Sequence, residues 1–189
     1  LLALPASAAA GTLTKPSGPE SCLADASSTL PPGTCETAKG IDDATDVAIS
    51  PDGKFAYAAA TSSNSIAVFS RDSASGNLTQ LEGTDGCIAW DGDPIDGCAE
   101  AHGLEGPTSL AISPDGKNIY VTSFQLDTSN ATSPVIAGQL TSFSRDASTG
   151  ALTQLSCAAG SISPVPLLIT PSSPPAGCGN AVFPQATAR

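Results

Sequence analysis

The sequence predicts an all-β fold, a β-propeller, because two of its segments each occur twice. Residues 46–57 read DVAISPDGKFAY and residues 109–120 read SLAISPDGKNIY, with 8 of 12 positions identical. Residues 69–81 (FSRDSASGNLTQL) recur at residues 143–155 (FSRDASTGALTQL), with 9 of 13 identical. Self-similarity at a period of about sixty to seventy residues indicates a repeat architecture, in which each unit buries its apolar faces only against its neighbours.

Three G-x-L-T segments mark the starts of the repeat units. They begin at Gly11, Gly76 and Gly150, which defines units at residues 11–75, 76–149 and 150–189. The second unit is longer because an insertion of 11 residues falls within residues 124–139. The third unit reaches residue 189 before any SPDGK segment. We therefore expect residues 11–189 to form an incomplete β-propeller, with two complete blades and the start of a third.

Alternation and turn residues predict four antiparallel strands in each unit. In the first unit, Val47 and Ile49 lie on a short strand that enters a tight turn at residues 51–54. In that turn proline presets φ and glycine accepts the left-handed conformation. The returning strand and the two strands after it are expected at residues 55–61, 66–72 and 77–81. Four short strands per repeat are typical of a propeller blade. A β-solenoid is the main alternative, but its coils are usually shorter than this period.

Two motifs give the chain a family resemblance. An SPDGK turn is followed by a strand ending YVTS (residues 120–123), and then by FSRD-x-x-x-G-x-L-T-Q-L. This combination resembles the YVTN-type, lactonase-like β-propeller repeat, whose family includes seven-bladed 6-phosphogluconolactonase-like proteins. The resemblance covers residues 11–155. It implies a closed ring of about seven blades, so we expect the chain to be the N-terminal part of a longer protein that supplies the remaining blades.

The N-terminal residues and the cysteines both indicate an extracytoplasmic protein. Residues 1–10 (LLALPASAAA) are apolar and end in small residues, as does the back half of a secretory signal peptide. An alanine-rich terminus with no targeting role is the alternative. Six cysteines in 189 residues favour disulfides, which persist only in an oxidising compartment. We therefore expect a secreted, periplasmic or cell-surface protein without a membrane span.

The spacing of the cysteines predicts one local pair per unit. Cys22 and Cys87 each lie 11 residues after the opening glycine, and Cys35 and Cys98 each lie 16 residues before the turn proline. Three local disulfides are the simplest interpretation, although six cysteines allow fifteen pairings. A zinc site is the alternative, but there is no C-x-x-C motif and the only histidine is His102. The expected pairs are Cys22 with Cys35, Cys87 with Cys98, and Cys157 with Cys178.

Charge and composition exclude one class of partner. Eighteen acidic and seven basic residues give a formal net charge of −11. Such a chain repels phosphate backbones, so we expect no nucleic-acid binding. Nothing in the sequence requires a cofactor, and we expect none.

We expect the segments that differ between the repeat units to lie on one face of the ring. In a four-stranded blade, the link to the next blade and the loop between strands two and three lie on the same face. The cysteine-bearing segments (17–45, 81–108 and 155 onward) and the insertion all belong to this set. Variable loops on a rigid scaffold commonly carry binding sites. We therefore place a binding face for an extracellular ligand or small molecule around the mouth of the central channel. The alternative is that the disulfides only stabilise long loops and that these loops bind no ligand.

Single residues offer two weaker site hypotheses. His102, with Glu100 and Glu105 nearby, is a candidate general base for opening a lactone, although a lone surface histidine is more often incidental. Asp91, Asp93 and Asp96 are candidate calcium ligands, although the segment lacks EF-hand spacing and is equally consistent with an acidic, solvated turn.

Two functions from different classes follow. The first is a secreted scaffold that binds a polymer, a protein or a cell surface through disulfide-stapled loops on one face. The second is a lactonase-like hydrolase that opens a cyclic ester at the central channel. Propellers host many functions, and no segment of this sequence matches a catalytic motif, so the sequence favours the scaffold.

Overall fold

The computed structural model describes residues 18–127, 135–161 and 179–180 of the chain. Within these ranges the chain consists of strands and turns, and its helical elements are two 3-10 turns, η1 (Pro19–Ser21) and η2 (Gly83–Gly86). None of the helices described is long and apolar enough to cross a membrane. The predicted all-β fold is confirmed. The segment resembling a signal peptide, residues 1–10, lies outside the described residues.

The first blade contains the four strands that the sequence predicts. They are antiparallel and pair in chain order: β3 (Ala44–Ile49), β4 (Phe55–Ala60), β5 (Ser65–Arg71) and β6 (Leu78–Gln80). The turn between β3 and β4 depends on Gly53, which has a φ of +71° that side-chain-bearing residues rarely adopt. Asp52 caps this turn by accepting hydrogen bonds from the Ser50 hydroxyl and from the Lys54 amide.

The second blade repeats this order with a longer central hairpin. Its strands are β9 (Pro107–Ile112), β10 (Asn118–Asp127), β11 (Val135–Arg145) and β12 (Leu152–Ser161). The ladder between β10 and β11 runs without interruption from the pair Asn118–Ser144 to the pair Asp127–Val135. Much of the insertion therefore lengthens two paired strands, whereas the sequence pattern predicted a loop. Residues 128–134, at its tip, lie outside the described residues.

The segments predicted as cysteine-bearing loops contain short parallel ladders. β1 (Leu23–Asp25) pairs with β2 (Glu36–Ala38), β7 (Cys87–Trp90) with β8 (Ala99–Ala101), and β12 with β13 (Gly179–Asn180). In all three, the residue after the first cysteine of the unit pairs with the residue after the second: Leu23 with Glu36, Ile88 with Ala99, and Ala158 with Gly179. The cysteine segments are thus a structural part of the repeat.

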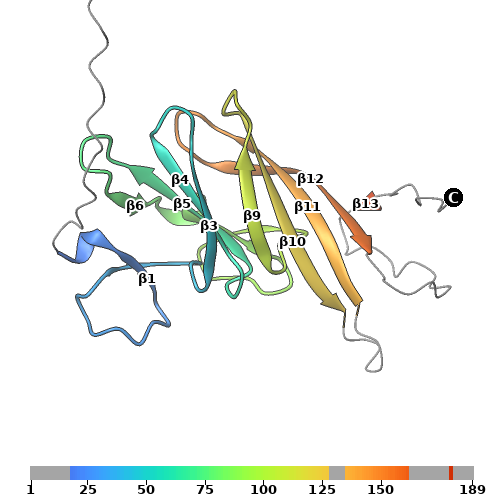
Figure 1. Cartoon of the computed structure of the whole chain (residues 1–189), viewed down its shortest axis with the longest axis horizontal. Coiled ribbons are helices and arrows are strands. Elements are labelled where there is room, and N and C mark those ends of the chain that lie inside the picture. Colours follow the sequence, from blue (N-terminus) through green and yellow to red (C-terminus); the bar gives the residue numbers. More distant parts are fainter. Residues whose placement is uncertain (1–17, 128–134, 162–178, 181–189) are drawn as a thin grey trace, which may run out of the picture.

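Two of the ladders extend the outer edges of the blade sheets, whereas the β1–β2 ladder forms a separate two-stranded sheet. In the first blade the strand order is β3-β4-β5-β7-β8, so β8 is the strand farthest from β3. The strand that lies next to the following blade is β3, which runs beside β9 at the centre of Figure 1. The sequence pattern predicted that these segments lie around the channel mouth. The β7–β8 segment lies instead at the blade periphery, because the pairing of β7 with β5 continues the sheet outward.

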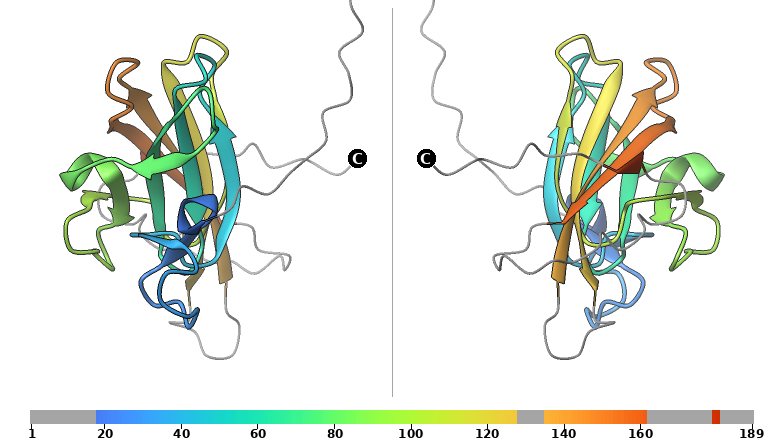
Figure 2. Two further views of the ribbon diagram at one scale, coloured as in Figure 1. Left: turned by 90° about the vertical axis from the view of Figure 1, so that its left-hand side faces the viewer. Right: turned by 90° about the vertical axis from the view of Figure 1, so that its right-hand side faces the viewer.

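Two apolar layers cover the two faces of the first blade. One face packs against the second blade through Tyr57, Ile66 and Val68, which meet Ile119, Val121 and Phe143. The other face packs against the β1–β2 ladder through small side chains, mainly Ala56, Ala58 and Ala67, with Phe69. All six residues of β4 are therefore buried, and the two sheets stack face to face (Figure 2). Alanine at these positions allows the ladder to approach closely.

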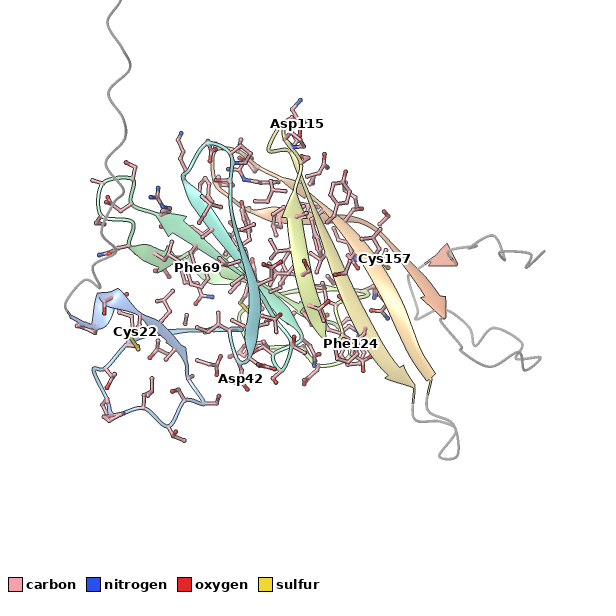
Figure 3. The ribbon with its side chains drawn as sticks, in the orientation of Figure 1. Cys22, Asp42, Phe69, Asp115, Phe124 and Cys157 are labelled. Carbon is pink, nitrogen blue, oxygen red and sulfur yellow. A yellow bond between two sulfur atoms is a disulfide. The ribbon has the colours of Figure 1, made fainter. Side chains whose placement is uncertain are left out.

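The blades have two different ends. We call the "turn end" the end that carries the turns after β3, β5, β9 and β11, and the "loop end" the end that carries the β4–β5 connection and residues 102–106. Asp115 lies at the turn end in Figure 3, and Asp42 lies at the opposite end. β7 pairs with the half of β5 nearest the loop end (Ser65–Ala67), while β6 pairs with the half nearest the turn end (Phe69–Arg71).

Candidate functional site

His102 and Asp91 form a hydrogen-bonded pair at the loop end. Nδ1 of His102 lies 2.8 Å from Oδ2 of Asp91, and the two side chains are 42% and 34% exposed. Each follows the last residue of a paired strand, because Trp90 ends β7 and Ala101 ends β8. The parallel register places these two strand ends side by side. The Asp91 carboxylate at Nδ1 orients the imidazole and leaves Nε2 as the ring nitrogen that is available for other contacts.

Asn64 connects this pair to the neighbouring segments. It has a left-handed φ of +50°, and its carbonyl accepts a hydrogen bond from the Trp90 amide at 2.8 Å. Its side-chain oxygen accepts a bond from the Gly106 amide at 2.8 Å, and its side-chain nitrogen donates to Asp93 at 3.4 Å. The β4–β5 turn, the loop after β7 and the entry to β9 are therefore held together by one residue.

Trp90 packs into its own loop. It is half-buried and contacts the core between the two blades. Gly92 lies so close to the indole that an added Cβ would come within 2.4 Å of the ring. The indole therefore fixes the position of the Asp91–Asp93 turn, and its contacts are those of a packing residue.

Two glutamines of the repeat clasp the segments that lead into each blade. Oε1 of Gln154 accepts a hydrogen bond from the His102 amide at 3.1 Å, and Nε2 of Gln154 donates to the His102 carbonyl at 2.8 Å. Gln80 makes the same two bonds to the amide and carbonyl of Lys39, at 2.8 and 2.9 Å. His102 and Lys39 are therefore equivalent positions, with side chains displayed at the same point of successive units.

Sequence reasoning did not single out these two glutamines, which position the backbone of Lys39 and His102. Both belong to the repeated segment G-x-L-T-Q-L, in which only the glycine and the alternating apolar residues have an evident structural role. The signal was the glutamine itself, because a polar side chain that repeats on a strand often satisfies a neighbouring backbone.

The candidate calcium ligands have separate partners. Asp91 contacts His102, Asp93 contacts Asn64, and the backbone carbonyl of Asp96 accepts a bond from Lys39 Nζ at 3.1 Å. Within the ranges that the structure describes, no group of three or more histidine, cysteine, aspartate or glutamate side chains is arranged to hold a metal ion.

The disulfides link the expected partners in the first two units. Cys22 is bonded to Cys35 and Cys87 to Cys98, with Cα atoms 4.9 and 4.8 Å apart. Cys157 also forms a disulfide. Cys178, its expected partner, lies outside the described residues.

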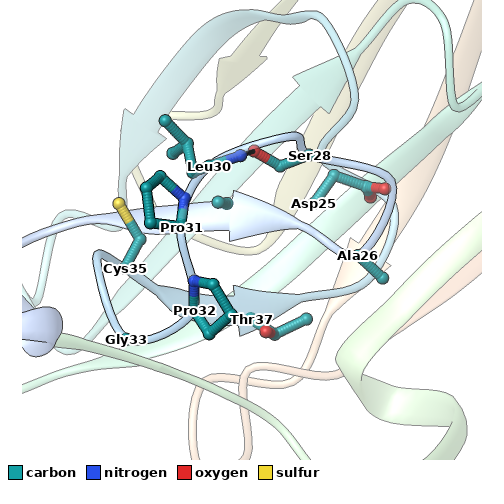
Figure 4. A pocket seen from close by; sticks show the side chains of 10 residues that line it. Asp25, Ala26, Ser28, Leu30, Pro31, Pro32, Gly33, Cys35 and Thr37 are labelled. Atoms are coloured by element: carbon teal, nitrogen blue, oxygen red, sulfur yellow. Dashed lines mark hydrogen bonds between the residues drawn. The ribbon is translucent and has the colours of Figure 1, made fainter.

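A small hollow lies inside the ring closed by Cys22 and Cys35 (Figure 4). Leu30, Pro31 and Pro32 line one side of it, and Asp25, Ser28 and Thr37 supply polar groups. Burial of the Asp25 carboxylate opposes ionisation, but hydrogen bonds from Ser27 and other backbone groups keep its pKa below the usual value. Leu30 is 50% exposed, so the hollow is open to solvent.

The two ends differ in charge. At the turn end, four acidic residues (Asp52, Asp72, Asp115, Asp146) alternate with four basic ones (Lys54, Arg71, Lys117, Arg145). At the loop end, Asp42, Asp43, Asp91 and Asp93 are exposed, and Lys39 and His102 are the basic groups beside them among the described residues. The loop end therefore has a negative potential, which attracts cations and repels anions.

The first repeat matches a known family. Residues 20–86 match the family model described as "Lactonase, 7-bladed beta-propeller". The fold is that of part of a β-propeller, whose two described blades are built on the strand sets β3 to β6 and β9 to β12. More particularly, the resemblance to the lactonase-like seven-bladed repeat is confirmed by this match.

Solved structures with similar blades have low sequence identity. A functionally unknown protein from Desulfotomaculum acetoxidans is 18% identical, with a TM-score of 0.44, over 64% of this chain and 28% of its own. A putative 6-phosphogluconolactonase from Bacteroides uniformis is 20% identical, with a TM-score of 0.30, over 57% and 38%. The periplasmic gluconolactonase of Pseudomonas aeruginosa is 20% identical, with a TM-score of 0.29, over 59% and 38%.

The chain therefore spans well under half the length of these solved proteins. No curated protein matches it.

Proposed function

We propose that this chain is part of a secreted β-propeller that binds an extracellular ligand at its loop end, together with the blades that complete the ring. The observation that carries the proposal is the cysteine-anchored ladder, which recurs in one register while the loops it holds differ in length and sequence. Rigid anchoring of divergent loops is an arrangement suited to recognition.

The charge of the loop end indicates the class of ligand. Its exposed aspartates repel anionic polymers, so the ligand is cationic or neutral. Lys39 and His102, clasped by equivalent glutamines, are displayed at corresponding points of successive units. They are the side chains we expect to differ in role between units, because one is a lysine and the other a histidine.

Binding to polymers of known charge tests this proposal. The immobilised chain is exposed to poly-L-lysine, a neutral glucan and poly-L-glutamate. We expect binding of the first or the second, weakened by Asp93→Asn at the loop end and unaffected by the matched change Asp72→Asn at the turn end. Binding of poly-L-glutamate, binding of no polymer, or equal loss in both variants contradicts the proposal.

A lactonase-like hydrolase is the second candidate, and the His102–Asp91 pair is the observation that favours it. Nε2 of His102 would take a proton from water as its oxygen attacks the lactone carbonyl, and would return that proton to the ring oxygen as the C–O bond breaks. Scaffold binding is favoured because, among the described residues, neither His102 nor Asp91 contacts a lysine or arginine that would stabilise an oxyanion.

Hydrolysis of δ-gluconolactone by the chain and by His102→Gln separates the two candidates. The hydrolase requires turnover above the spontaneous rate that is lost in His102→Gln. The scaffold requires identical rates for both proteins and for buffer.

A further inference from the structure

The second blade extends past its own first strand at the loop end. β10 pairs with β11 as far as Asp127, but its pairing with β9 stops at the pair of Ser123 with Pro107. Figure 1 shows β10 and β11 continuing beyond the end of β9. Pro107 begins β9 and has no amide hydrogen to donate, so the ladder ends there. Residues 124–127 of β10 therefore form an edge on the side where β9 would lie.

The direction of the backbone groups along this edge follows from two hydrogen bonds. The carbonyl of Asn118 accepts a bond from the Ser113 amide, and the Phe124 amide donates to the Gly106 carbonyl at 3.2 Å. Both bonds point toward β9, and every second residue of a strand points its amide and carbonyl to the same side. Leu126 is the next residue with this orientation. Within the described residues, its amide and carbonyl have no partner on that side.

Hydrogen bonds connect this edge to the acidic loop end. The Gly106 amide, which would otherwise return a bond to the Phe124 carbonyl, donates to the side-chain oxygen of Asn64 at 2.8 Å. The side-chain nitrogen of Asn64 donates in turn to Asp93 at 3.4 Å. A segment that pairs with Leu126 and continues past Phe124 therefore enters the negative potential of the loop end.

Completion of the ring does not fill this edge. Further blades stack on the faces of the sheets, as the second blade stacks on the first (Figure 2), whereas the edge lies in the plane of its own sheet. The first blade has no such edge, because β3 pairs with β4 up to Ala60, the last residue of β4. The edge is therefore a feature of the residues inserted in the second unit.

We propose that the β10 edge at residues 124–126 binds an extended, basic segment of a partner protein, which adds a short strand beside β10. Unpaired backbone groups at a sheet edge accept an extended chain in this way, and main-chain hydrogen bonds supply affinity. The exposed aspartates of the adjoining loop end select a segment that carries lysine or arginine. The proposal rests on ligand binding at the loop end and narrows its ligand to an extended polypeptide.

A pair of substitutions at one position tests the proposal. The probe is a capped heptapeptide of alternating lysine and valine, titrated into the chain by isothermal calorimetry. Leu126→Pro removes the amide hydrogen that points away from β11, and the matched control Leu126→Ala keeps it. We expect the affinity to fall roughly fivefold in Leu126→Pro and to change by less than about twofold in Leu126→Ala.

Hydrogen exchange at the Leu126 amide gives a second measurement, which needs no variant. We expect the heptapeptide to slow this exchange roughly tenfold, because the amide gains a partner, and to leave amides in the turn after β5 unchanged. Absence of peptide binding, equal affinity of the parent and Leu126→Pro, or unchanged exchange at Leu126 in the complex overturns the proposal.

Asp93→Asn distinguishes failure of this proposal from failure of loop-end binding. If it weakens the heptapeptide while Leu126→Pro does not, charge alone holds the ligand, and strand addition is overturned although loop-end binding stands. Slower exchange at Leu126 in the chain alone, as its concentration rises, also overturns the proposal, because the occupant would then be a second copy.

Discussion

At the scale of single residues, one sequence motif has different physical roles according to its neighbour. Arg145 and Arg71 occupy the same place in FSRD, yet the first is buried and makes bonds to a second blade while the second is half-exposed. Burial of the Arg145 guanidinium opposes its charge, but bonds from it to Asp52 and Tyr57 raise its pKa. Burial also raises the pKa of the Tyr57 hydroxyl. The motif therefore encodes a contact that is completed only when the adjacent blade is present.

Truncation of the two arginines should separate these roles. We expect Arg145→Ala to lower the free energy of unfolding by about 2 to 4 kcal/mol, because it removes charged hydrogen bonds. It also removes the donor from which the buried Tyr57 hydroxyl accepts a hydrogen bond. We expect Arg71→Ala to lower it by about 1 kcal/mol or less, because its site is more exposed. Urea denaturation of both variants measures the difference. Equal losses would show that the inter-blade bonds contribute nothing.

The Asp52 carboxylate makes this contact pH-dependent. The Ser50 hydroxyl and the Arg145 guanidinium hold the pKa of Asp52 well below its usual value of about 4. A folded-state pKa that is depressed stabilises the fold above the unfolded value, and this contribution is lost as the pH falls below it. We expect the stability difference between the parent and Asp52→Asn to be constant near neutral pH and to shrink below about pH 4. A difference that grows on acidification would contradict this assignment.

At the scale of secondary-structure elements, the repeat is fixed by two devices at the outer edge of each blade. A disulfide closes the β1–β2 ladder and another closes the β7–β8 ladder, and in both cases a glutamine of the next fourth strand holds the residue that follows the ladder. Parallel strands of three residues are too short to be stable alone, so each ladder depends on these cross-links. The loop-end side chains Lys39 and His102 are positioned as a result.

Removal of a clasp should loosen one ladder without unfolding the blade. We expect Gln154→Ala to lower the free energy of unfolding by about 1 to 2 kcal/mol, since the amide and carbonyl of His102 lose their partners. The matched control is Thr153→Ala, at the exposed position before it. Hydrogen exchange at the His102 amide should accelerate in the first variant only. Unchanged protection of that amide would show that Gln154 is not its partner in solution.

Removal of a disulfide should act on the same element through the unfolded state. Cys87 and Cys98 are separated by 11 residues, and loops of this size contribute about 3 kcal/mol in the chain-entropy model. We expect the double change to alanine at these positions to cost about that amount. We further expect it to increase proteolysis between them. Stability equal to that of the parent, measured by thermal unfolding, would mean that the ladder is held by packing alone.

The elements were predictable from sequence to different degrees. Turn residues and alternation located β3 to β6, because each strand is bounded by glycine or by a polar turn. Equal spacing predicted two disulfides that the structure contains. The ladders were not predictable, because two- to four-residue strands such as β7, β8 and β13 carry no periodicity. The meeting of His102 with Asp91 depends on the parallel register of β7 and β8, which local sequence does not reveal.

At the scale of the whole molecule, the neighbouring blade decides which apolar residues are buried. Leu110 in β9 and Val47 in β3 are equivalent in the repeat, yet Leu110 is 7% exposed and Val47 is 60% exposed. Ile49 on β3 and Leu140 on β11 are also exposed, on the open sides of the two described blades. Sequence patterning marked all of these positions as apolar, but it does not show which of them have a blade packed against them.

Alanine substitution of the equivalent pair tests this dependence. We expect Leu110→Ala to cost about 2 to 5 kcal/mol, because it leaves a cavity against the first blade. We expect Val47→Ala to change the free energy of unfolding by less than about 0.5 kcal/mol, because no described element covers that side chain. Urea unfolding of the parent and both variants gives the comparison. An equal cost for Val47→Ala and Leu110→Ala would contradict this expectation. It would mean that Val47 is buried against a surface outside the two described blades.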